Sequence, residues 1–385
     1  MAARAGVSPA TVSNALSGLR GVTGDRRRAV LEAVEALGYK SNHMASSLRR
    51  GETRTVGIVV PDLGNEYFAG LVRQWEKIAS TSGYEMLVVA SGEDPATEAR
   101  RIESLIARRI DGLLVVAAGD DFGANPAFPE RLPPTVLVDR AYGHPDFDTV
   151  ASNNLDAAYR GCRHLIEIGH REITLLIASM NHTHLRDRVE GYRRALREAG
   201  LAGRERIVFG GGTMEGCRSA IEQDLRRSDP PTAVFAATFY ATLGAVKAIN
   251  ALEADFPRTV SLLGFERSEW MTAVRPYISA VEQSVDDLAK RSWLALRDRM
   301  AGDTSDPKRV LLDLRLVIRE STRPPGYEPS NGSGPDPRPT RREPRESQRR
   351  RPSAAANIDL PAETVRLQKG RLKTKQRQSS RGTQQ

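Results

Sequence analysis

The stretch Thr55-Val-Gly-Ile-Val-Val60 decides the fold of the long central region. It is an apolar run without alternation, which predicts a strand buried on both faces. Residues 67–82 follow with apolar side chains at helical spacing, and Gly83 stands where a helix C-cap belongs. The run Glu85-Met-Leu-Val-Val-Ala90 predicts the next strand, so residues 55–90 form one predicted strand–helix–strand unit.

The same unit recurs along the chain. Further buried strands are predicted at residues 112–116, 135–138, 172–177, 233–236 and 260–264, with helices such as 187–199 and 242–253 between them. Alternating strands and helices are typical of a parallel sheet covered by helices. The units are too many for one small sheet, so the sequence predicts an α/β fold with two lobes.

Composition limits the class of protein. The 385 residues, 39% of them hydrophobic, suffice for more than one core. Cys162 and Cys217 are the only cysteines, too few for a disulfide framework and without zinc-site spacing, which favours a reducing cytoplasm and no metal or other cofactor. The N-terminus has no apolar export signal, and no stretch approaches the ~20 apolar residues of a membrane span.

The net charge of +9 is concentrated at the two ends. Residues 1–50 contain 8 Lys/Arg against 3 Asp/Glu, and residues 324–385 contain 14 against 6. A basic end favours a polyanionic partner, although a solvated charged surface is the simpler alternative. Residues 324–385 are rich in Pro, Gly, Ser, Arg and Gln, which predicts a disordered basic tail that either adds nonspecific DNA affinity or has no function.

Residues 3–18, Ala-Arg-Ala-Gly-Val-Ser-Pro-Ala-Thr-Val-Ser-Asn-Ala-Leu-Ser-Gly, have the pattern of a tight turn followed by a short helix. Gly6 permits the turn, and Val12 and Leu16 are spaced to face a core. Residues 25–37 predict a further helix behind the turn. The short side chains on the outer face suit the major groove, where an asparagine can make a bidentate contact with adenine. The predicted DNA-contacting residues are Ser8 as N-cap, Pro9 at the first helical position, Ala10, Thr11, Ser13 and Asn14.

Several ordered motifs together resemble the lactose/galactose-repressor family. They are Arg4-Ala-Gly-Val-Ser-x-x-Thr-Val-Ser-x-x-Leu16, Gly38-Tyr39, Asn42, Leu48-Arg-Arg-Gly51 and, near the end of the folded region, Arg315-Leu-Val-Ile-Arg-Glu-Ser-Thr322. The resemblance implies an all-α helix-turn-helix headpiece at residues 1–41 and a hinge helix with linker at 42–52. Behind them it implies a periplasmic-binding-protein-like effector-binding and dimerisation domain at 53–323.

The resemblance also divides that domain. Lobe 1 is expected at about residues 53–150 and 283–308, and lobe 2 at about 151–282 and 309–323, with three chain crossings between them. Residues 324–385 lie outside the resemblance.

The hinge is expected to order on DNA and to insert a leucine into the minor groove, which kinks a base step. Asn42, Ala45 and Leu48 are the residues that match its DNA contacts, with a packed linker leucine as the alternative for Leu48. Ser41 and Ser46 depart from the family pattern, which predicts weaker hinge contacts.

The headpiece departs from the family at its first helix, of which only residues 2–5 remain. This shortening predicts that Val12, Leu16, Val30 and Val34 are exposed and that the headpiece frays. Either translation starts upstream or the headpiece is impaired, and the intact motif favours the first interpretation.

The effector is expected beyond the carboxyl ends of strands. The resemblance assigns Arg188, in Arg188-Val-Glu-Gly-Tyr192, a grip on ligand hydroxyls or carboxylate, and it assigns hydrogen-bond acceptance to Glu266. The other predicted contacts are Tyr67, Phe68, Asp139, His182, His184, Thr238 and Phe239. Exposed surface charge is the alternative for each carboxylate. Thr238-Phe239 and Gly210-Gly-Gly212 depart from the pattern of relatives and make a sugar ligand less secure, and His182 and His184 lack a nearby third metal ligand.

These features predict a transcription regulator, acting as a repressor, that binds a palindromic operator as a homodimer and responds to a sugar or related metabolite. An enzyme is disfavoured because the chain has no phosphate-loop, nucleophile-elbow or His-Glu-x-x-His motif. The remaining alternative is a soluble small-molecule binding protein with an impaired headpiece.

Overall fold

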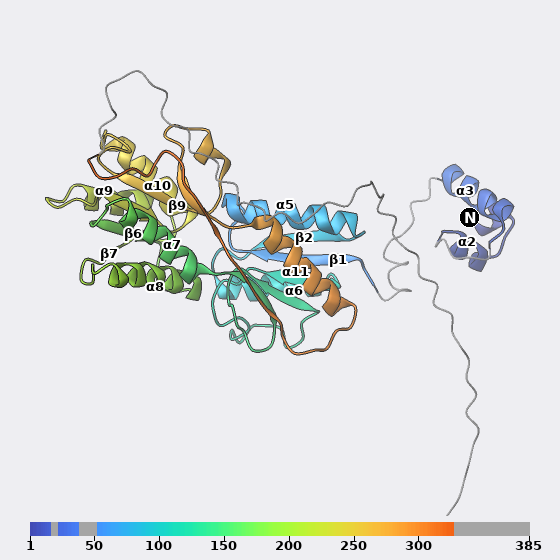
Figure 1. Ribbon diagram of the computed structural model, residues 1–385. Coiled ribbons are helices and arrows are strands. Elements are labelled where there is room, and N and C mark those ends of the chain that lie inside the picture. Colours follow the sequence, from blue (N-terminus) through green and yellow to red (C-terminus); the bar gives the residue numbers. More distant parts are fainter. Residues whose placement is uncertain (17–21, 38–51, 327–385) are drawn as a thin grey trace, which may run out of the picture. The chain divides into compact units, whose positions relative to one another are not determined.

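The computed structural model of the chain describes residues 1–16, 22–37 and 52–326 (Figure 1). Residues 52–326 contain two six-stranded sheets, each covered by helices on both faces. The predicted hinge contacts Asn42, Ala45 and Leu48 lie outside the described residues, as do residues 327–385 of the predicted tail. The expectation of an α/β fold with two lobes is confirmed.

Lobe 1 has the strand order β11-β5-β4-β3-β1-β2, with every pairing parallel. Helices α5 (Glu66–Thr81) and α11 (Val285–Met300) pack side by side on one face, and α6 (Pro95–Ile106) covers the other (Figure 1). Trp75 and Trp293 anchor the first face, and the Trp75 indole donates to Ser292 Oγ at 2.9 Å. The strands are β1 (Thr55–Val60), β2 (Glu85–Ala90), β3 (Gly112–Val115), β4 (Thr135–Val138), β5 (Asp148–Ser152) and β11 (Arg309–Leu312).

Lobe 2 repeats this architecture with the order β12-β10-β9-β8-β6-β7. Helices α7 (Asn154–Glu167) and α8 (Thr183–Glu198) pack on one face, and α9 (Met214–Leu225) and α10 (Phe239–Ala251) on the other. The pairing of β10 with β12 is antiparallel. The strands are β6 (Ile173–Ile177), β7 (Arg206–Phe209), β8 (Ala233–Ala236), β9 (Ser261–Phe265), β10 (Ser279–Glu282) and β12 (Arg315–Val317), and a short 3-10 helix spans Glu269–Thr272.

Within residues 52–326 the chain passes between the sheets three times, after β5, after β10 and after β11. The last passage differs from the sequence-based expectation. Residues 309–312, assigned above to lobe 2, form β11 and pair with β5 in lobe 1, with Arg309 opposite Thr149. Val310 and Leu312 pack on the core of lobe 1, and that burial holds the strand at the edge of its sheet.

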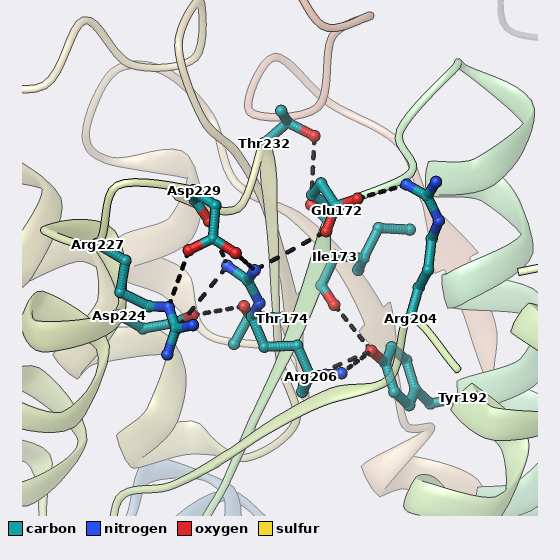
Figure 2. Close-up of polar contacts among 10 residues, drawn as sticks. All are labelled: Glu172, Ile173, Thr174, Tyr192, Arg204, Arg206, Asp224, Arg227, Asp229 and Thr232. Atoms are coloured by element: carbon teal, nitrogen blue, oxygen red, sulfur yellow. Dashed lines mark hydrogen bonds and ion pairs between the residues drawn. The ribbon is translucent and has the colours of Figure 1, made fainter. Parts of the chain in front are cut away.

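A polar network ties together the amino ends of three strands in lobe 2 (Figure 2). The guanidinium of Arg206, at the start of β7, bonds Asp229 at 2.9 Å and lies 3.8 Å from Glu172, just before β6. Thr174 donates to the buried carboxylate of Asp224 at 2.6 Å. These contacts lie at the amino ends of the strands, whereas the effector site is predicted at the carboxyl ends. They therefore stabilise the fold away from the predicted effector site.

The Arg-x-x-Gly-aromatic motif has a structural part that is separate from ligand binding. A Cβ atom at Gly191 would lie 2.2 Å from the carbonyl oxygen of Leu155, so only glycine permits α7 and α8 to approach this closely. The Tyr192 hydroxyl donates to the carbonyl of Ile173 at 2.8 Å and accepts from the N–H of Arg206 at 3.0 Å. Two of the three motif residues therefore fix the position of α8.

The headpiece contains α1 (Ala2–Ala5), α2 (Pro9–Leu16) and α3 (Gly24–Ala36). The expected exposure of Val12 and Val30 is wrong, because these side chains are 8% and 0% exposed. Ala2 and Ala5 of the short α1 pack against this small core, together with Met1, Val7, Val22 and Val34. Val34 is partly buried, and the side chain of Leu16 lies outside the described residues.

None of the helices in the described part of the chain is both long and apolar enough to cross a membrane.

Candidate functional site

The outer face of α2 is the first candidate site. Gly6 takes the left-handed conformation, with φ 63°, that the turn before α2 requires. Ser8 Oγ accepts from the N–H of Thr11 at 3.1 Å and thereby caps the helix. Pro9, Ala10 and Asn14 are exposed and Thr11 is half-exposed, while the Ser13 side chain is outside the described residues. The predicted DNA-contacting face is thus free of headpiece packing at these exposed positions.

The second candidate site lies at the carboxyl ends of the strands of both sheets. Asp139 follows β4 and Glu266 follows β9, and both have left-handed backbones, with φ 67° and 75°. Each N–H continues its ladder, Asp139 to the carbonyl of Val150 and Glu266 to that of Val281, both at 2.8 Å. Non-glycine residues held in this conformation are strained, and such strain is concentrated at binding sites. Asp139 and Glu266 therefore have equivalent backbone conformations at the strand ends of the two lobes.

Arg188 is the buried cation of this site. Its side chain is 2% exposed, and its guanidinium lies over the Phe265 ring at 3.6 Å from the ring centroid. Nε donates to Asn154 at 2.9 Å and one terminal nitrogen donates to the carbonyl of Ala237 at 2.6 Å. A terminal nitrogen lies 4.0 Å from Glu266, so the two charges are close without a hydrogen bond.

Glu266 is buried beside Arg188, and its Oε2 atom has no partner. Burial raises the pKa of its carboxyl to about 7, although Arg188 acts in the opposite direction. A buried acceptor without a partner destabilises the folded chain, and a hydrogen bond from a donor offsets this cost. Glu266 therefore presents a buried oxygen that is available for a hydrogen bond, and its contact with an effector stays a prediction.

Tyr67 and Asp139 form a second polar pair within lobe 1. The buried Tyr67 hydroxyl donates to Asp139 at 2.8 Å, and Gln283 Oε1 lies 2.8 Å from the same hydroxyl. Ser152 donates to Gln283 Oε1 at 2.9 Å, while the Gln283 amide nitrogen is buried without a partner. This nitrogen is therefore a buried donor that is available for a hydrogen bond.

His182 and His184 face lobe 1 from the start of α8, with their rings stacked at a centroid distance of 5.4 Å. Both Nδ1 atoms are buried without a hydrogen-bond partner. Burial, with the charge of Arg140 nearby, lowers the pKa of both rings, so both are neutral at neutral pH. Arg140 bonds Glu93 through both terminal nitrogens and lies 5.5 Å from the centroid of the Phe68 ring.

Thr238 and Phe239, also predicted as effector contacts, have structural partners. Thr238 Oγ1 accepts from the N–H of Ala241 at 3.2 Å and caps α10. Phe239 is buried and packs against Tyr240, whose hydroxyl donates to Asp62 of lobe 1 at 2.6 Å. Among these neighbours, Tyr240 makes the contact between lobes.

A cavity of about 180 Å³ is lined from both lobes, by Asp139, Arg140 and Ser152 on one side and by His184 and Asp187 on the other, whereas Arg188, Glu266 and Gln283 do not line it. The sequence-based prediction missed Arg140, Asn154, Gln283 and Tyr240. Arg140, Asn154 and Gln283 follow the ends of β4, β5 and β10, so applying the strand-end rule to every strand would have found them. No group of three or more His, Cys, Asp or Glu residues suited to a metal ion occurs within the described ranges.

We expect Glu266 to make chain stability depend on pH. Unfolded glutamate loses its proton near pH 4.5, whereas folded Glu266 keeps it up to about pH 7. Its stabilising contribution is therefore complete below pH 4.5 and is lost as pH rises through 7. Relative to the wild type, Glu266→Gln should remove on the order of 2 kcal/mol of the decline in unfolding free energy between pH 5 and pH 8.

Urea unfolding across this pH interval measures the difference. Glu98 is also buried, with a pKa raised to about 7, so the stability of the Glu266→Gln variant will still depend on pH. The pH dependence of the variant is therefore compared with that of the wild type. Glu103→Gln, at an exposed position of α6, is the matched control. If the free energy of unfolding depended on pH identically in Glu266→Gln and in the wild type, Glu266 would not have a raised pKa.

Comparison with known proteins gives two family matches and close relatives. Residues 1–42 match "Bacterial regulatory proteins, lacI family", and residues 53–268 match "Periplasmic binding proteins and sugar binding domain of LacI family". The HTH-type transcriptional repressor CytR of Escherichia coli (strain K12) is 30% identical over 324 residues, which are 84% of this chain and 95% of the relative.

Two solved structures resemble the fold. A complex of the transcriptional regulator CelR with cellobiose is 27% identical, with a TM-score of 0.62 over 83% of this chain and 98% of that one. The lac repressor dimer bound to operator and the anti-inducer ONPF is 22% identical, with a TM-score of 0.75 over 84% of this chain and 97% of that one.

Proposed function

We propose a function from the premise that this chain belongs to the LacI family of bacterial regulatory proteins. The chain is a DNA-binding transcription regulator of that family. It represses transcription by binding a palindromic operator as a homodimer, through the face of α2 that carries Asn14. A small effector, a sugar or related metabolite, binds between the lobes and controls this activity. Members of the family are regulators rather than enzymes, and we propose the same for this chain.

One observation carries the effector proposal: buried polar atoms without partners converge where the lobes meet. They include Glu266 Oε2, the Gln283 amide nitrogen and the Nδ1 atoms of His182 and His184. They comprise both acceptors and donors, and Glu266 lies 4.0 Å from the guanidinium of Arg188. Such a set suits a ligand with several hydroxyl groups, because each hydroxyl both donates and accepts. The cellobiose complex of CelR supports a sugar among the first compounds to test.

The DNA-binding proposal is tested by selection from random duplexes. A twofold-symmetric dimer recognises a twofold-symmetric site, so the full chain should enrich an inverted repeat. Enrichment of direct repeats only, or of no motif, would contradict it. The absence of any enriched motif together with retained ligand binding would instead favour a small-molecule binding protein.

The effector proposal is tested by thermal shift against sugars, sugar acids and nucleobases. A ligand at 100 times its dissociation constant stabilises the folded chain by about 2.7 kcal/mol. Calorimetry on any compound that raises the melting temperature should show a loss of about 2–4 kcal/mol of affinity in Arg188→Ala, because ligand oxygens would lose a charged donor. Unchanged affinity in that variant would exclude Arg188 from the site.

A further inference from the structure

Helix α8 lacks the local cap that the other long helices of the lobes have. Its N-cap residue, His182, accepts no hydrogen bond through its side chain. In the part of the chain between residues 52 and 326, each of the other α-helices is capped by its own N-cap side chain. Those caps are Asn65, Asp94, Asn153, Thr213, Thr238 and Ser284.

Asp120 of lobe 1 occupies the place of the missing cap. Its two carboxylate oxygens accept from the N–H of Thr183, the first residue of α8, at 3.0 and 2.9 Å. Asp120 Oδ2 also accepts from the Thr183 hydroxyl and from Arg186, both at 2.7 Å. Burial disfavours the charged form of Asp120, but the bonds from Thr183 and Arg186 outweigh it and hold the pKa of this carboxyl below its usual value.

Lobe 1 holds Asp120 in place through a buried carboxylate. Asp120 lies on the loop that follows β3, and the N–H of Ala118 on that loop donates to Glu98 at 2.7 Å. Glu98 is 3% exposed on α6. The capping group is therefore fixed to the core of one lobe, while the helix that it caps belongs to the other.

Other contacts between the lobes also pair a carboxylate of lobe 1 with a donor of lobe 2. Asp62 accepts from Tyr240, and Glu66 accepts from the Ser268 hydroxyl and from the N–H of Glu269 at 3.2 Å. In each of these contacts lobe 1 provides the carboxylate and lobe 2 the donor. Glu66 bonds the N–H of Glu269 at the start of the four-residue 3-10 helix, whereas Asp120 bonds the N–H of Thr183 at the start of the sixteen-residue α8. The free N–H groups of a helix N-terminus prefer an anion.

We propose that Asp120 is an interlobe cap, so that closure of the lobes and ordering of the first turn of α8 occur together. When the lobes separate, the N–H of Thr183 loses its partner and this turn has no local cap to replace it. The same turn carries His184, and the next one carries Arg188. The link to effector binding rests on the function proposed above, whereas the cap itself rests on the contacts alone.

The test uses the full chain without DNA or added ligand, so its result does not depend on the proposed effector. Hydrogen exchange at residues 181–188 reports the cap, and Asp120→Ala should accelerate exchange there about fivefold, the usual effect of losing an N-cap. Asp121→Ala is the matched control, because Asp121 is the exposed neighbour with the same charge. It should leave exchange unchanged.

Spin labels on Arg101→Cys in α6 and Gln223→Cys in α9 report the separation of the lobes, because both positions are exposed. Burial raises the pKa of the Cys162 thiol to about 12 and of the Cys217 thiol to about 11, so both native thiols stay unlabelled. Dilution with unlabelled chain isolates distances within one chain. Asp120→Ala should lengthen or broaden the distance distribution, and Asp121→Ala should not.

A local replacement cap separates capping from closure. His182→Ser in the Asp120→Ala background gives α8 its own N-cap, so protection of the first turn should return while the lobes stay apart. If Asp120→Ala lowers the folded fraction, Asp120→Asn provides the same comparison with a milder change. Unchanged exchange or unchanged lobe separation in both Asp120 variants would overturn the proposal. A return of the distance between the spin labels to its wild-type value in Asp120→Ala/His182→Ser would also overturn the proposal, because Asp120 would then act on α8 alone and not on closure of the lobes.

Discussion

Replacement of Arg188 by methionine should lower the free energy of unfolding by about 3–5 kcal/mol at pH 8, because its buried hydrogen-bond partners lose a charged donor and Glu266 loses the cation beside it. At that pH Glu266 is ionised, since its pKa is about 7, and it loses the cation 4.0 Å away. Asn154 and the carbonyl of Ala237 also lose their donors. Without the cation the Glu266 carboxyl takes up a proton instead of staying charged, so the part of the loss that depends on pH is limited to about 1.4 kcal/mol and should be absent at pH 5.

Urea unfolding at the two pH values measures this difference. Arg193→Met on the same helix is the control, because Arg193 pairs with Glu205 at the surface and should contribute less than about 1 kcal/mol. The double variant Arg188→Met/Glu266→Gln should recover the part of the loss that depends on pH, because the carboxyl of Glu266 is then absent. An equal loss at both pH values, or no recovery in the double variant, would show that the two charges are not coupled.

Local sequence patterns predict the strands that are buried on both faces, and they predict residues that follow those strands. Residues 55–60 form β1 as predicted, because a strand covered on both faces requires an unbroken apolar run. The role of Glu266 was predicted from the family resemblance, whereas Asp139 was predicted from the rule that ligand-binding residues follow strands in open α/β sheets. These rules depend only on neighbouring residues, so the sequence alone suffices for them.

Contacts between distant segments escaped the sequence analysis. Residues 309–312 alternate exposed and half-buried positions, a pattern that suits the edge of either sheet, and packing on lobe 1 decides between them. Asp120 and Thr183 are 63 residues apart, and no local motif announces their bond. The burial of Val12 and Val30 depends on Met1 and Ala2, which a count of missing helical turns does not include.

Asn14→Ala in α2 should reduce affinity for the selected operator by about 1–3 kcal/mol, because a bidentate contact with adenine would be lost. Asn14 is exposed on this helix, so the change should leave headpiece packing intact. Asparagine carries no charge, so affinity for random DNA and the dependence on salt should stay constant. Fluorescence anisotropy with operator and random duplexes measures both affinities, and Asn250→Ala on α10 is the matched control. Equal losses on both duplexes, or no loss on either, would remove Asn14 from the recognition surface.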